Sequence, residues 1–370
     1  MYFLVSALVV ALAASICNSQ PLDLTTNPTE DTAQPVVDSQ SPNITIHPIQ
    51  RNGNTVQPVL GGMNFPDPSM IRINQNLFYA FSTNSRYNGV IVNVPMAHST
   101  DFQTWTSNGA QDALPNLPAW VDKSNPMVWA PDVVQLPTGF VMYYTASYAA
   151  QPNFHCLGVA ISNTITGPYK PTSDQPWLCP TSQGGAIDPS GYTGHDGRRW
   201  VVYKIDGNSI GHGGSCNNGI APIVPTPIML QQVSSSDGFT KIGNPIQLIT
   251  NSLADGPVTE APSLSKMPDG TFVLFFSSNC YTTPGYDVSY ATSKNIQGPY
   301  IKHGPLFVTG TSGLTAPGGL DIAINGNHAV FHANWGSGRA MFTAIISGGG
   351  NSWNAFAPLN GGAQGNKESM

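Results

Sequence analysis

The chain has 370 residues, which suffices for one large all-β domain or for two domains of medium size. Only 9% of the residues are charged, whereas there are 38 glycines and 32 prolines, so the composition favours short strands and turns over helices. The formal net charge is -6 with 14 lysines and arginines, which excludes the basic surface that nucleic acid or an anionic membrane would require. We therefore expect a neutral partner, and neither nucleic acid nor a membrane.

The first segment of the chain has the pattern of a secretory signal peptide. Residues 1–20 hold an apolar run that ends in small polar residues and is too short to span a membrane, although the usual basic start is missing. A signal anchor is the alternative. Residues 21–55 are rich in Thr, Pro, Asp, Gln and Ser and predict a disordered linker, in which Asn43 stands in a glycosylation sequon. These features predict a secreted protein.

Five short segments, each with one acidic residue, follow at intervals of 56 to 72 residues. They are Asp67-Pro68-Ser69, Pro131-Asp132-Val133, Asp188-Pro189-Ser190, Glu260-Ala261-Pro262-Ser263 and Leu320-Asp321-Ile322. After each one comes an apolar run, a polar turn and a second apolar or aromatic run, which is the pattern of a β-hairpin. We expect the same structural unit five times, with the five acids at equivalent positions.

The hairpins and a third strand can be assigned from the sequence. The paired segments are 70–73 with 77–81, 133–136 with 140–145, 191–192 with 199–203, 264–266 with 272–276, and 322–324 with 329–331. The third strand is clearest at 160–162 and 291–293, because each is followed at the same spacing by Gly-Pro-Tyr. Such a period with about four strands per unit is typical of a propeller. We predict an all-β, five-bladed propeller over residues 56–347 and a Gly-rich C-terminal tail over 348–370.

The acids are the candidate chemical groups. In a propeller, equivalent residues of successive units meet at one mouth of the central channel, so Asp67, Asp188 and Glu260 are expected to converge. Neighbouring carboxylates raise one another's pKa, and a split between a protonated and an ionised carboxyl is what glycoside cleavage requires. Asp132 and Asp321 have different surroundings, and we expect them to bond backbone amides or the channel wall.

Four cysteines remain once Cys17 is removed with the signal peptide, and they allow three pairings. We favour Cys156 with Cys179, which closes a short loop, and Cys216 with Cys280, which joins two long Asn/Gly-rich loops. Metal ligation is the alternative, but the spacings resemble no common zinc pattern.

The acidic segments resemble glycoside hydrolase family 43 over residues 60–345. The similar segments are Asn64-Phe65-Pro66-Asp67-Pro68-Ser69, Val128-Trp129-Ala130-Pro131-Asp132-Val133, Ala186-Ile187-Asp188-Pro189-Ser190 and Val258-Thr259-Glu260-Ala261-Pro262-Ser263. The resemblance implies a five-bladed propeller and an inverting enzyme that acts on arabinan, arabinoxylan and xylo-oligosaccharides. It also implies that the partner is a plant cell-wall polysaccharide or oligosaccharide.

The resemblance also assigns roles to single residues. It implies that Asp67 is the general base, that Glu260 is the general acid, and that Asp188 orients the acid and tunes its pKa. Arg339 matches an arginine of the last blade that reaches the sugar in many members of the family.

Aromatic residues and histidines extend the predicted site. Trp129 is expected either to stack on a sugar or to be buried in its blade. Tyr281 and His212 lie in the loops around the second cysteine pair and are expected to line the pocket. For His332 we expect a structural role.

The metal expectation rests on a departure from the family. Many members carry a Gly-His-Gly whose histidine helps to hold a metal in the channel, whereas this chain has Ala316-Pro317-Gly318-Gly319 at that place. We therefore expect no metal ligands and no required cofactor, with calcium as the alternative, and a monomeric protein.

The sequence thus predicts a secreted inverting hydrolase of arabinofuranosyl or xylosyl linkages, with exo-acting cleavage favoured by the long loops at 207–225 and 279–286. An endo-arabinanase is one alternative. A retaining enzyme like invertase or levansucrase is another, although Ile187 stands where that group normally has arginine before Asp-Pro. The third alternative is a glycan-binding propeller without catalytic activity.

Overall fold

The computed structural model describes residues 56–324, 326–349 and 352–356, and these form five four-stranded antiparallel sheets. The predicted signal peptide, the linker and Asn43 lie outside the described residues. A separate two-stranded hairpin, β3 (Ser85–Tyr87) and β4 (Val90–Val92), is inserted in the first sheet's sequence. The prediction of an all-β, five-bladed propeller is confirmed.

The strands of the five blades are given from the innermost to the outermost. Blade one has β1 (Ser69–Asn74), β2 (Leu77–Phe81), β5 (Met96–Ser99) and β6 (Trp105–Ser107). Blade two has β7 (Trp129–Leu136), β8 (Gly139–Ser147), β9 (His155–Ser162) and β10 (Lys170–Pro171). Blade three has β11 (Ala186–Thr193), β12 (Arg199–Ile205), β13 (Ile228–Val233) and β14 (Lys241–Ile249). Blade four has β15 (Thr259–Lys266), β16 (Phe272–Ser278), β17 (Asp287–Ser293) and β18 (Ile301–Phe307), and blade five has β19 (Gly318–Ile322), β20 (His328–Trp335), β21 (Gly338–Gly349) and β22 (Ser352–Phe356).

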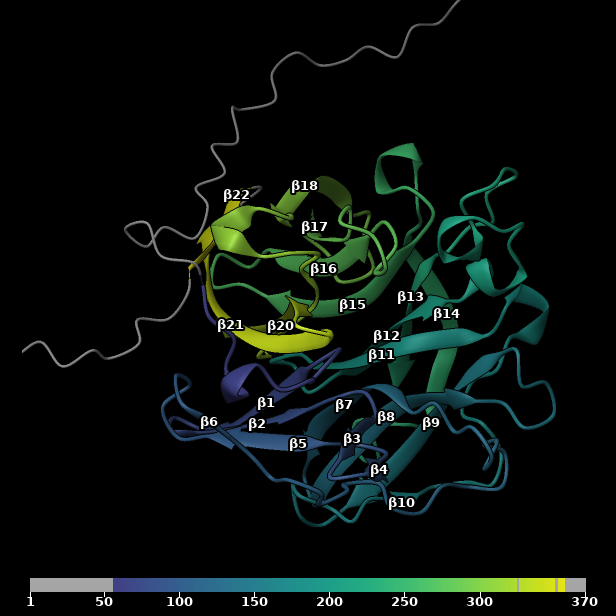
Figure 1. Cartoon of the computed structure of the whole chain (residues 1–370), viewed down its shortest axis with the longest axis vertical. Coiled ribbons are helices and arrows are strands. Elements are labelled where there is room, and N and C mark those ends of the chain that lie inside the picture. Colours follow the sequence, from purple (N-terminus) through teal and green to yellow (C-terminus); the bar gives the residue numbers. More distant parts are fainter. Residues whose placement is uncertain (1–55, 325, 350–351, 357–370) are drawn as a thin grey trace, which may run out of the picture. The chain divides into compact units, whose positions relative to one another are not determined.

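The blades follow one another around a centre, with β6, β10, β14, β18 and β22 toward the periphery (Figure 1). Blade five meets blade one directly. The backbone N–H of Phe65 donates to the carbonyl of Arg339, and that of Val59 donates to the carbonyl of Met341. The chain segment before β1 therefore closes the ring against β21.

Alternation along the strands explains how each sheet is covered on both faces. Successive side chains of a strand point to opposite faces. In β1, Met70 packs in a core cluster with blade five and Ile71 in a cluster with blade two. In β7, Val133 packs toward blade one and Val134 toward blade three. Clusters between blades three and four and between blades four and five complete the set, so every sheet depends on both neighbours for burial.

A residue in the left-handed region stands at or just before the start of each inner strand, and in four of the five strands it lies in a β-bulge. The five residues with positive φ at this point are Asp67 (48°), Ala130 (40°), Asp188 (55°), Ala261 (50°) and Gly319 (57°). The register shifts of β7, β11, β15 and β19 span this position. We call these five residues the bulge ring, and the residues two positions later the second ring: Ser69, Asp132, Ser190, Ser263 and Asp321.

The bulge ring corrects the expectation that the five acids are equivalent. Only Asp67 and Asp188 belong to the bulge ring. Glu260 precedes its bulge residue by one position, and Asp132 and Asp321 belong to the second ring. The expectation was wrong because the acids stand at different offsets from the shared bulge position, and in a strand a shift by one residue turns a side chain to the other face.

The last blade extends beyond the predicted boundary at residue 347, since β21 reaches Gly349 and β22 supplies the fourth strand. The helical turns of the described residues are short 3-10 segments: Leu60–Gly62, Thr181–Gln183, Gly207–Ile210, Ser215–Asn217, Leu253–Asp255 and Thr311–Gly313. None of these helical turns approaches the length or apolar character needed to cross a membrane.

Two disulfides join the cysteines as favoured from the sequence. Cys156 pairs with Cys179 in blade two, and Cys216 pairs with Cys280. The second bridge links a loop after β12 in blade three to a loop after β16 in blade four. It therefore fastens adjacent blades to each other.

Candidate active site

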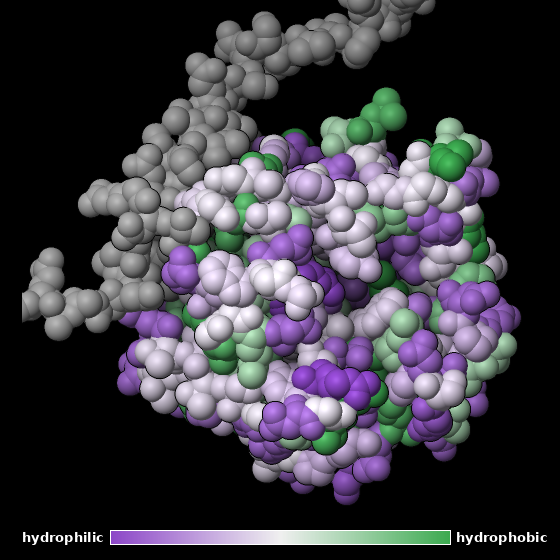
Figure 2. All heavy atoms as spheres, in the orientation of Figure 1, coloured by the Kyte–Doolittle hydropathy of each residue, from purple (hydrophilic) through white to green (hydrophobic). Residues whose placement is uncertain are grey.

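The channel is lined by the same three positions of all five blades. Its pocket is bounded by Asp67–Ser69, Ala130–Asp132, Asp188–Ser190, Ala261–Ser263 and Gly319–Asp321. Figure 2 shows a hollow near the middle of one face, with hydrophilic residues in its wall. The predicted acids Asp67 and Asp188 lie in this lining, and Glu260 directly precedes it. The fold therefore brings three carboxyl groups from blades one, three and four to the channel.

Asp67 is bound by a cation and a hydroxyl. Nη1 of Arg339 donates to Oδ1 at 2.6 Å, Nη2 of Arg339 donates to Oδ2 at 3.2 Å, and Oγ1 of Thr83 donates to Oδ2 at 2.6 Å. Burial by itself would raise the pKa of Asp67, but the charge of Arg339 and the hydrogen bonds hold the pKa below its ordinary value. Asp67 is therefore ionised at neutral and mildly acidic pH.

His332 contacts the backbone of Asp67 as a neutral imidazole. The backbone N–H of Asp67 donates to Nδ1 of His332 at 3.1 Å, so the proton of the neutral imidazole is on Nε2. Burial and the nearby Arg339 guanidinium lower the pKa of His332 to about 3. Tyr286 stacks on the imidazole with the ring centroids 5.9 Å apart. These contacts agree with the structural role expected for this histidine.

Asp188 holds a proton more tightly than an ordinary aspartate. Burial and the charge of Glu260 raise the pKa of Asp188 to about 7, against the opposing charge of Lys204. Its Oδ2 accepts a hydrogen bond of 2.9 Å from the backbone N–H of Ala261, the residue after Glu260. Asp188 is therefore anchored to the backbone that carries Glu260.

Glu260 forms an ion pair that the sequence analysis did not foresee. Nζ of Lys204 lies 2.9 Å from Oε2 of Glu260 and 3.2 Å from Oδ1 of Asp206. Lys204 is fully buried and Glu260 is 9% exposed. The signal in the sequence was one lysine inside the apolar run of β12, where a buried charge requires a partner.

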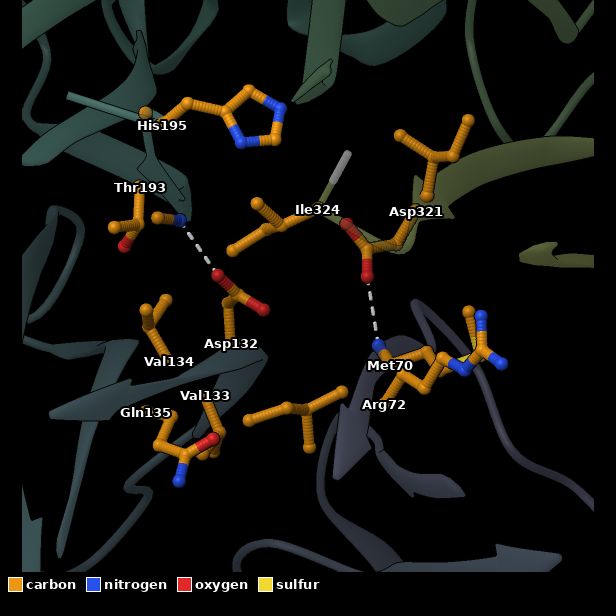
Figure 3. Close-up of a pocket in the computed structure, with 14 residues that line it drawn as sticks. Met70, Arg72, Asp132, Val133, Val134, Gln135, Thr193, His195, Asp321 and Ile324 are labelled. Carbon is orange, nitrogen blue, oxygen red and sulfur yellow. Dashed lines mark hydrogen bonds between the residues drawn. The ribbon is translucent and has the colours of Figure 1, made fainter. Parts of the chain in front are cut away.

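Asp132 and Asp321 connect blades instead of contacting a side-chain cation. The backbone N–H of Gly191 donates to Oδ2 of Asp132 at 2.6 Å, and that of Met70 donates to Oδ2 of Asp321 at 2.7 Å. Ser263 donates to Oδ1 of Asp321 at 2.7 Å. Figure 3 shows the two acids on either side of a pocket farther along the inner strands. Their expected bonds to backbone amides are confirmed.

The rim of the site includes the predicted aromatic residues. The Arg339 guanidinium carbon lies 5.1 Å from the ring centroid of Tyr281, which is 46% exposed. Trp129 adjoins the bulge residue Ala130 and stacks on His155 with the ring centroids 3.9 Å apart, so one of its faces is already covered. His212 is exposed in the loop between β12 and β13. Tyr281 thus contacts Arg339, which in turn binds Asp67, and Trp129 lies next to the channel lining.

The carboxylates and the histidine at the channel are already bonded to other groups of the protein. No group of three or more His, Cys, Asp or Glu side chains in the described part of the chain is arranged as a metal site. In the channel, Nδ1 of His332 already accepts from Asp67, and Nε2 is 3.5 Å from Nη1 of Arg339, a position unsuited to a second cation. The expectation that no metal is required stays a prediction.

Comparison with known proteins agrees with the fold and identifies the family. The sequence profile of the glycosyl hydrolases family 43 matches residues 55–341. An extracellular endo-alpha-(1->5)-L-arabinanase of Thermotoga petrophila is 27% identical over 267 residues, which are 63% of this chain and 50% of that protein. Xylosidase/arabinosidase 43B of Humicola insolens is 27% identical over 259 residues, 66% of this chain and 41% of that protein.

The solved structures support the same architecture. A thermostable family-43 glycoside hydrolase superposes with a TM-score of 0.67 at 21% identity, covering 82% of this chain and 96% of that chain. The chain spans about half the length of the first of these curated relatives and less of the second. Because the family profile covers most of the chain, the protein belongs to glycosyl hydrolase family 43.

Proposed function

We propose that the protein is a secreted, inverting glycoside hydrolase that cleaves arabinofuranosyl or xylosyl linkages of plant cell-wall polysaccharide. In this proposal Asp67 is the general base, Glu260 is the general acid, and Asp188 is the aspartate that orients the acid. Arg339, Tyr281 and Trp129 contact the sugar. Two of the relatives described above are named as an arabinanase and a xylosidase/arabinosidase, which supports these two substrate classes.

The observation that carries the proposal is the opposite electrostatics of two carboxyls in one channel. Arg339 holds the pKa of Asp67 low, so this group is available as a base, whereas the pKa of Asp188 is raised to about 7. Asp188 adjoins Glu260, so this side of the channel can keep a proton near neutral pH while Asp67 stays ionised, and the proposal places that proton on Glu260 for donation. An ionised base and a retained proton in one channel are what acid–base cleavage of a glycoside requires.

The reaction is a single displacement. Ionised Asp67 takes a proton from a water molecule while the water oxygen forms a bond to the anomeric carbon. The bond from that carbon to the glycosidic oxygen breaks, and protonated Glu260 gives its proton to the departing oxygen. The product has inverted anomeric configuration.

Exo-acting cleavage is the favoured mode. The loop after β12 and the loop after β16 are joined by Cys216–Cys280, and the second loop places Tyr281 over Arg339. We infer that loops held together at the rim close one side of the site, as a pocket for a chain end requires. The endo-arabinanase alternative remains, since relatives carry that name.

Secretion and a monomeric state are part of the proposal. The two disulfides support an oxidising compartment. Size-exclusion chromatography with light scattering checks the monomer, and recovery of the protein from the medium of expressing cells checks its secretion.

The test uses purified protein with linear arabinan, arabinoxylan, and the nitrophenyl arabinofuranoside and xyloside, with products separated by length. We expect release of single sugars, and proton NMR of the first product should give the inverted anomer. A ladder of longer products would favour the endo mode, and a retained anomer would favour the mechanism of an invertase-like enzyme. Glycan binding without any hydrolysis on this panel would contradict the enzymatic proposal.

A further inference from the structure

Lys204 interrupts a hydrogen-bond pattern that the other four blades share. Each residue of the bulge ring donates its backbone N–H to a side chain of the preceding blade. In four of the five blades the acceptor lies in the second strand of that preceding blade or directly after it. The four bonds are Ala130 to Oγ1 of Thr83 (2.9 Å), Asp188 to Oγ1 of Thr145 (3.1 Å), Gly319 to Oγ of Ser277 (2.9 Å) and Asp67 to Nδ1 of His332 (3.1 Å). The fold therefore reserves this position for an acceptor.

In blade three the equivalent position is Lys204. The strand pairing aligns Lys204 with Ile187, just as it aligns Thr145 with Trp129, Ser277 with Glu260, and His332 with Gly318. An ammonium group has no lone pair, so it cannot accept the N–H of Ala261. Asp188 accepts that N–H instead, at 2.9 Å. Because Lys204 cannot accept this N–H, the hydrogen bond that the other blades make to a second-strand side chain is made here to Asp188, one of the proposed site residues.

Lys204 is a buried cation with two carboxylate partners. Burial alone would lower its pKa, but the charges of Glu260, Asp206 and Asp188 raise it above the ordinary value. The side chain has no exposed surface and reaches both Glu260 and Asp206. A buried charge requires partners, and Lys204 finds them in Glu260 and Asp206 at a position that is polar and neutral in the other four blades.

We propose that Lys204 is a positioning residue for the proposed proton donor. It holds Oε2 of Glu260, so Oε1 is left to carry the proton and to face the glycosidic oxygen. When Oε1 gives its proton and the glycosidic bond breaks, Glu260 becomes a carboxylate, and the ammonium stabilises this developing charge. By displacing the N–H of Ala261 onto Asp188, Lys204 also fixes Asp188 beside Glu260. The inference rests on the function proposed for Glu260.

The test separates proton donation from other steps by using two leaving groups. An arabino-oligosaccharide or xylo-oligosaccharide needs a proton on the departing oxygen, whereas a nitrophenyl glycoside with the same sugar needs little assistance. For Lys204→Met we expect kcat on the oligosaccharide to fall by about 100-fold, within the range of general acid catalysis. The kcat on the nitrophenyl glycoside should fall less than about fivefold, if leaving-group departure alone is affected.

The second readout is the pH profile of kcat on the oligosaccharide. The charge of Lys204 lowers the pKa of Asp188, so its removal lets the carboxyl cluster keep a proton to higher pH. The fall of activity on the alkaline side should therefore move to higher pH in the variant. A lysine with only a structural role would lower the melting temperature and would change neither this profile nor the ratio between the two substrates.

The double variant Lys204→Met/Asp206→Asn keeps the inference testable if the single variant does not fold. It removes one positive and one negative charge together, so no buried carboxylate at Asp206 is left without its cation. Lys241→Met is the matched control, because Lys241 is a lysine that stacks on Trp177 away from the acids. A folded double variant with oligosaccharide activity within threefold of the parent and an unchanged pH profile would overturn the inference.

Glu260→Gln, assayed in parallel, distinguishes this inference from the proposed function. If Glu260→Gln loses oligosaccharide hydrolysis and the Lys204 variants do not, only the role proposed for Lys204 is wrong. Undiminished oligosaccharide hydrolysis in Glu260→Gln would remove the proposed acid, and the role of Lys204 with it.

Discussion

The bulge ring and the second ring use the same residue type for different tasks. Asp67 and Asp188 in the bulge ring interact electrostatically with side-chain cations, Arg339 and Lys204. Asp132 and Asp321, two positions farther along their inner strands, accept backbone N–H groups of other blades. Asp188 also accepts the backbone N–H of Ala261, so what sets the bulge ring apart is the cation near each of its two acids. A carboxylate beside a cation can take part in chemistry, whereas Asp132 and Asp321 join two sheets. The nearby cation, and not the residue type, separates the acids of the two rings.

The largest expected effect lies in the bulge ring. Asp67→Asn removes the proposed base, and since acid–base assistance is worth roughly 10²- to 10⁴-fold, kcat on an arabino-oligosaccharide should fall by about that factor. Asp196→Asn is the control, because Asp196 is an exposed acid that pairs only with Arg198 among the ion pairs of the described residues. An Asp67→Asn variant that keeps more than about a tenth of the kcat of the parent would contradict the role of Asp67 as the base.

In the second ring the expected loss is in stability. Asp321→Ala leaves the buried N–H of Met70 and the hydroxyl of Ser263 without their acceptor, which costs about 2–4 kcal/mol in the free energy of unfolding. Urea unfolding measures this loss, and kcat per folded molecule should stay within about twofold at 25 °C. A stable variant with low kcat would place Asp321 among the chemical groups instead.

The pH dependence of stability gives the second ring a signature of its own. Burial raises the pKa of Asp321 to about 6, above the 3.8 of an ordinary aspartate, so the folded protein binds this proton more tightly than the unfolded chain. The contribution is fully present below pH 3.8 and is lost as the pH rises through about 6. Burial and the charge of Asp321 also raise the pKa of Asp132, so Asp132 acts in the same direction.

The measurement is urea unfolding of the parent and of Asp321→Asn from pH 4 to pH 7. Over this interval the Asp321 contribution should lower the free energy of unfolding of the parent, by about 1.4 kcal/mol for each unit of pKa difference at most. Asn cannot ionise, so the variant should show a smaller decrease. An equal decrease in both proteins would assign the pH dependence to other groups.

The smallest expected effect concerns the rim of the bulge ring. Tyr281→Ala removes a ring that the proposal places against the sugar beside Arg339, and the loss of one aromatic contact of about 0.5–1.5 kcal/mol predicts a rise in KM of roughly two- to thirteenfold. Tyr281→Phe keeps the ring and should behave like the parent. If both variants raise KM equally, the hydroxyl and not the stacking is what Tyr281 contributes.

Much of the fold was predictable because its signal is local and repeated. The strand pairs predicted for blades one, three and four lie within the observed pairs β1–β2, β11–β12 and β15–β16. The repeated Gly-Pro-Tyr also has one structure, since the hydroxyls of Tyr169 and Tyr300 donate to the carbonyls of Ile165 and Ile296. Recurrence at a fixed place in the unit is enough to recognise a blade without knowing its neighbours.

The different positions of the acids relative to the bulge were not predicted from the sequence. The acidic segments look alike, yet Glu260 stands one position before the bulge and Asp321 two positions after it. Lys204 also escaped notice as a site residue, because its partner Glu260 is 56 residues away in sequence and lies on the next blade. Such pairs depend on register and blade order, which no local pattern contains.

The sequence by itself determined the repeat, the number of blades and the acids that line the channel, and it favoured one of three disulfide pairings. Hydrophobic alternation and turn residues act over a few neighbours, so they can be recognised along the chain. Only the tertiary structure decided which acid meets Arg339, which meets Lys204 and which meets a backbone amide. Those contacts arise where five sheets converge, and the ionisation state of each carboxyl follows from the partner it finds there.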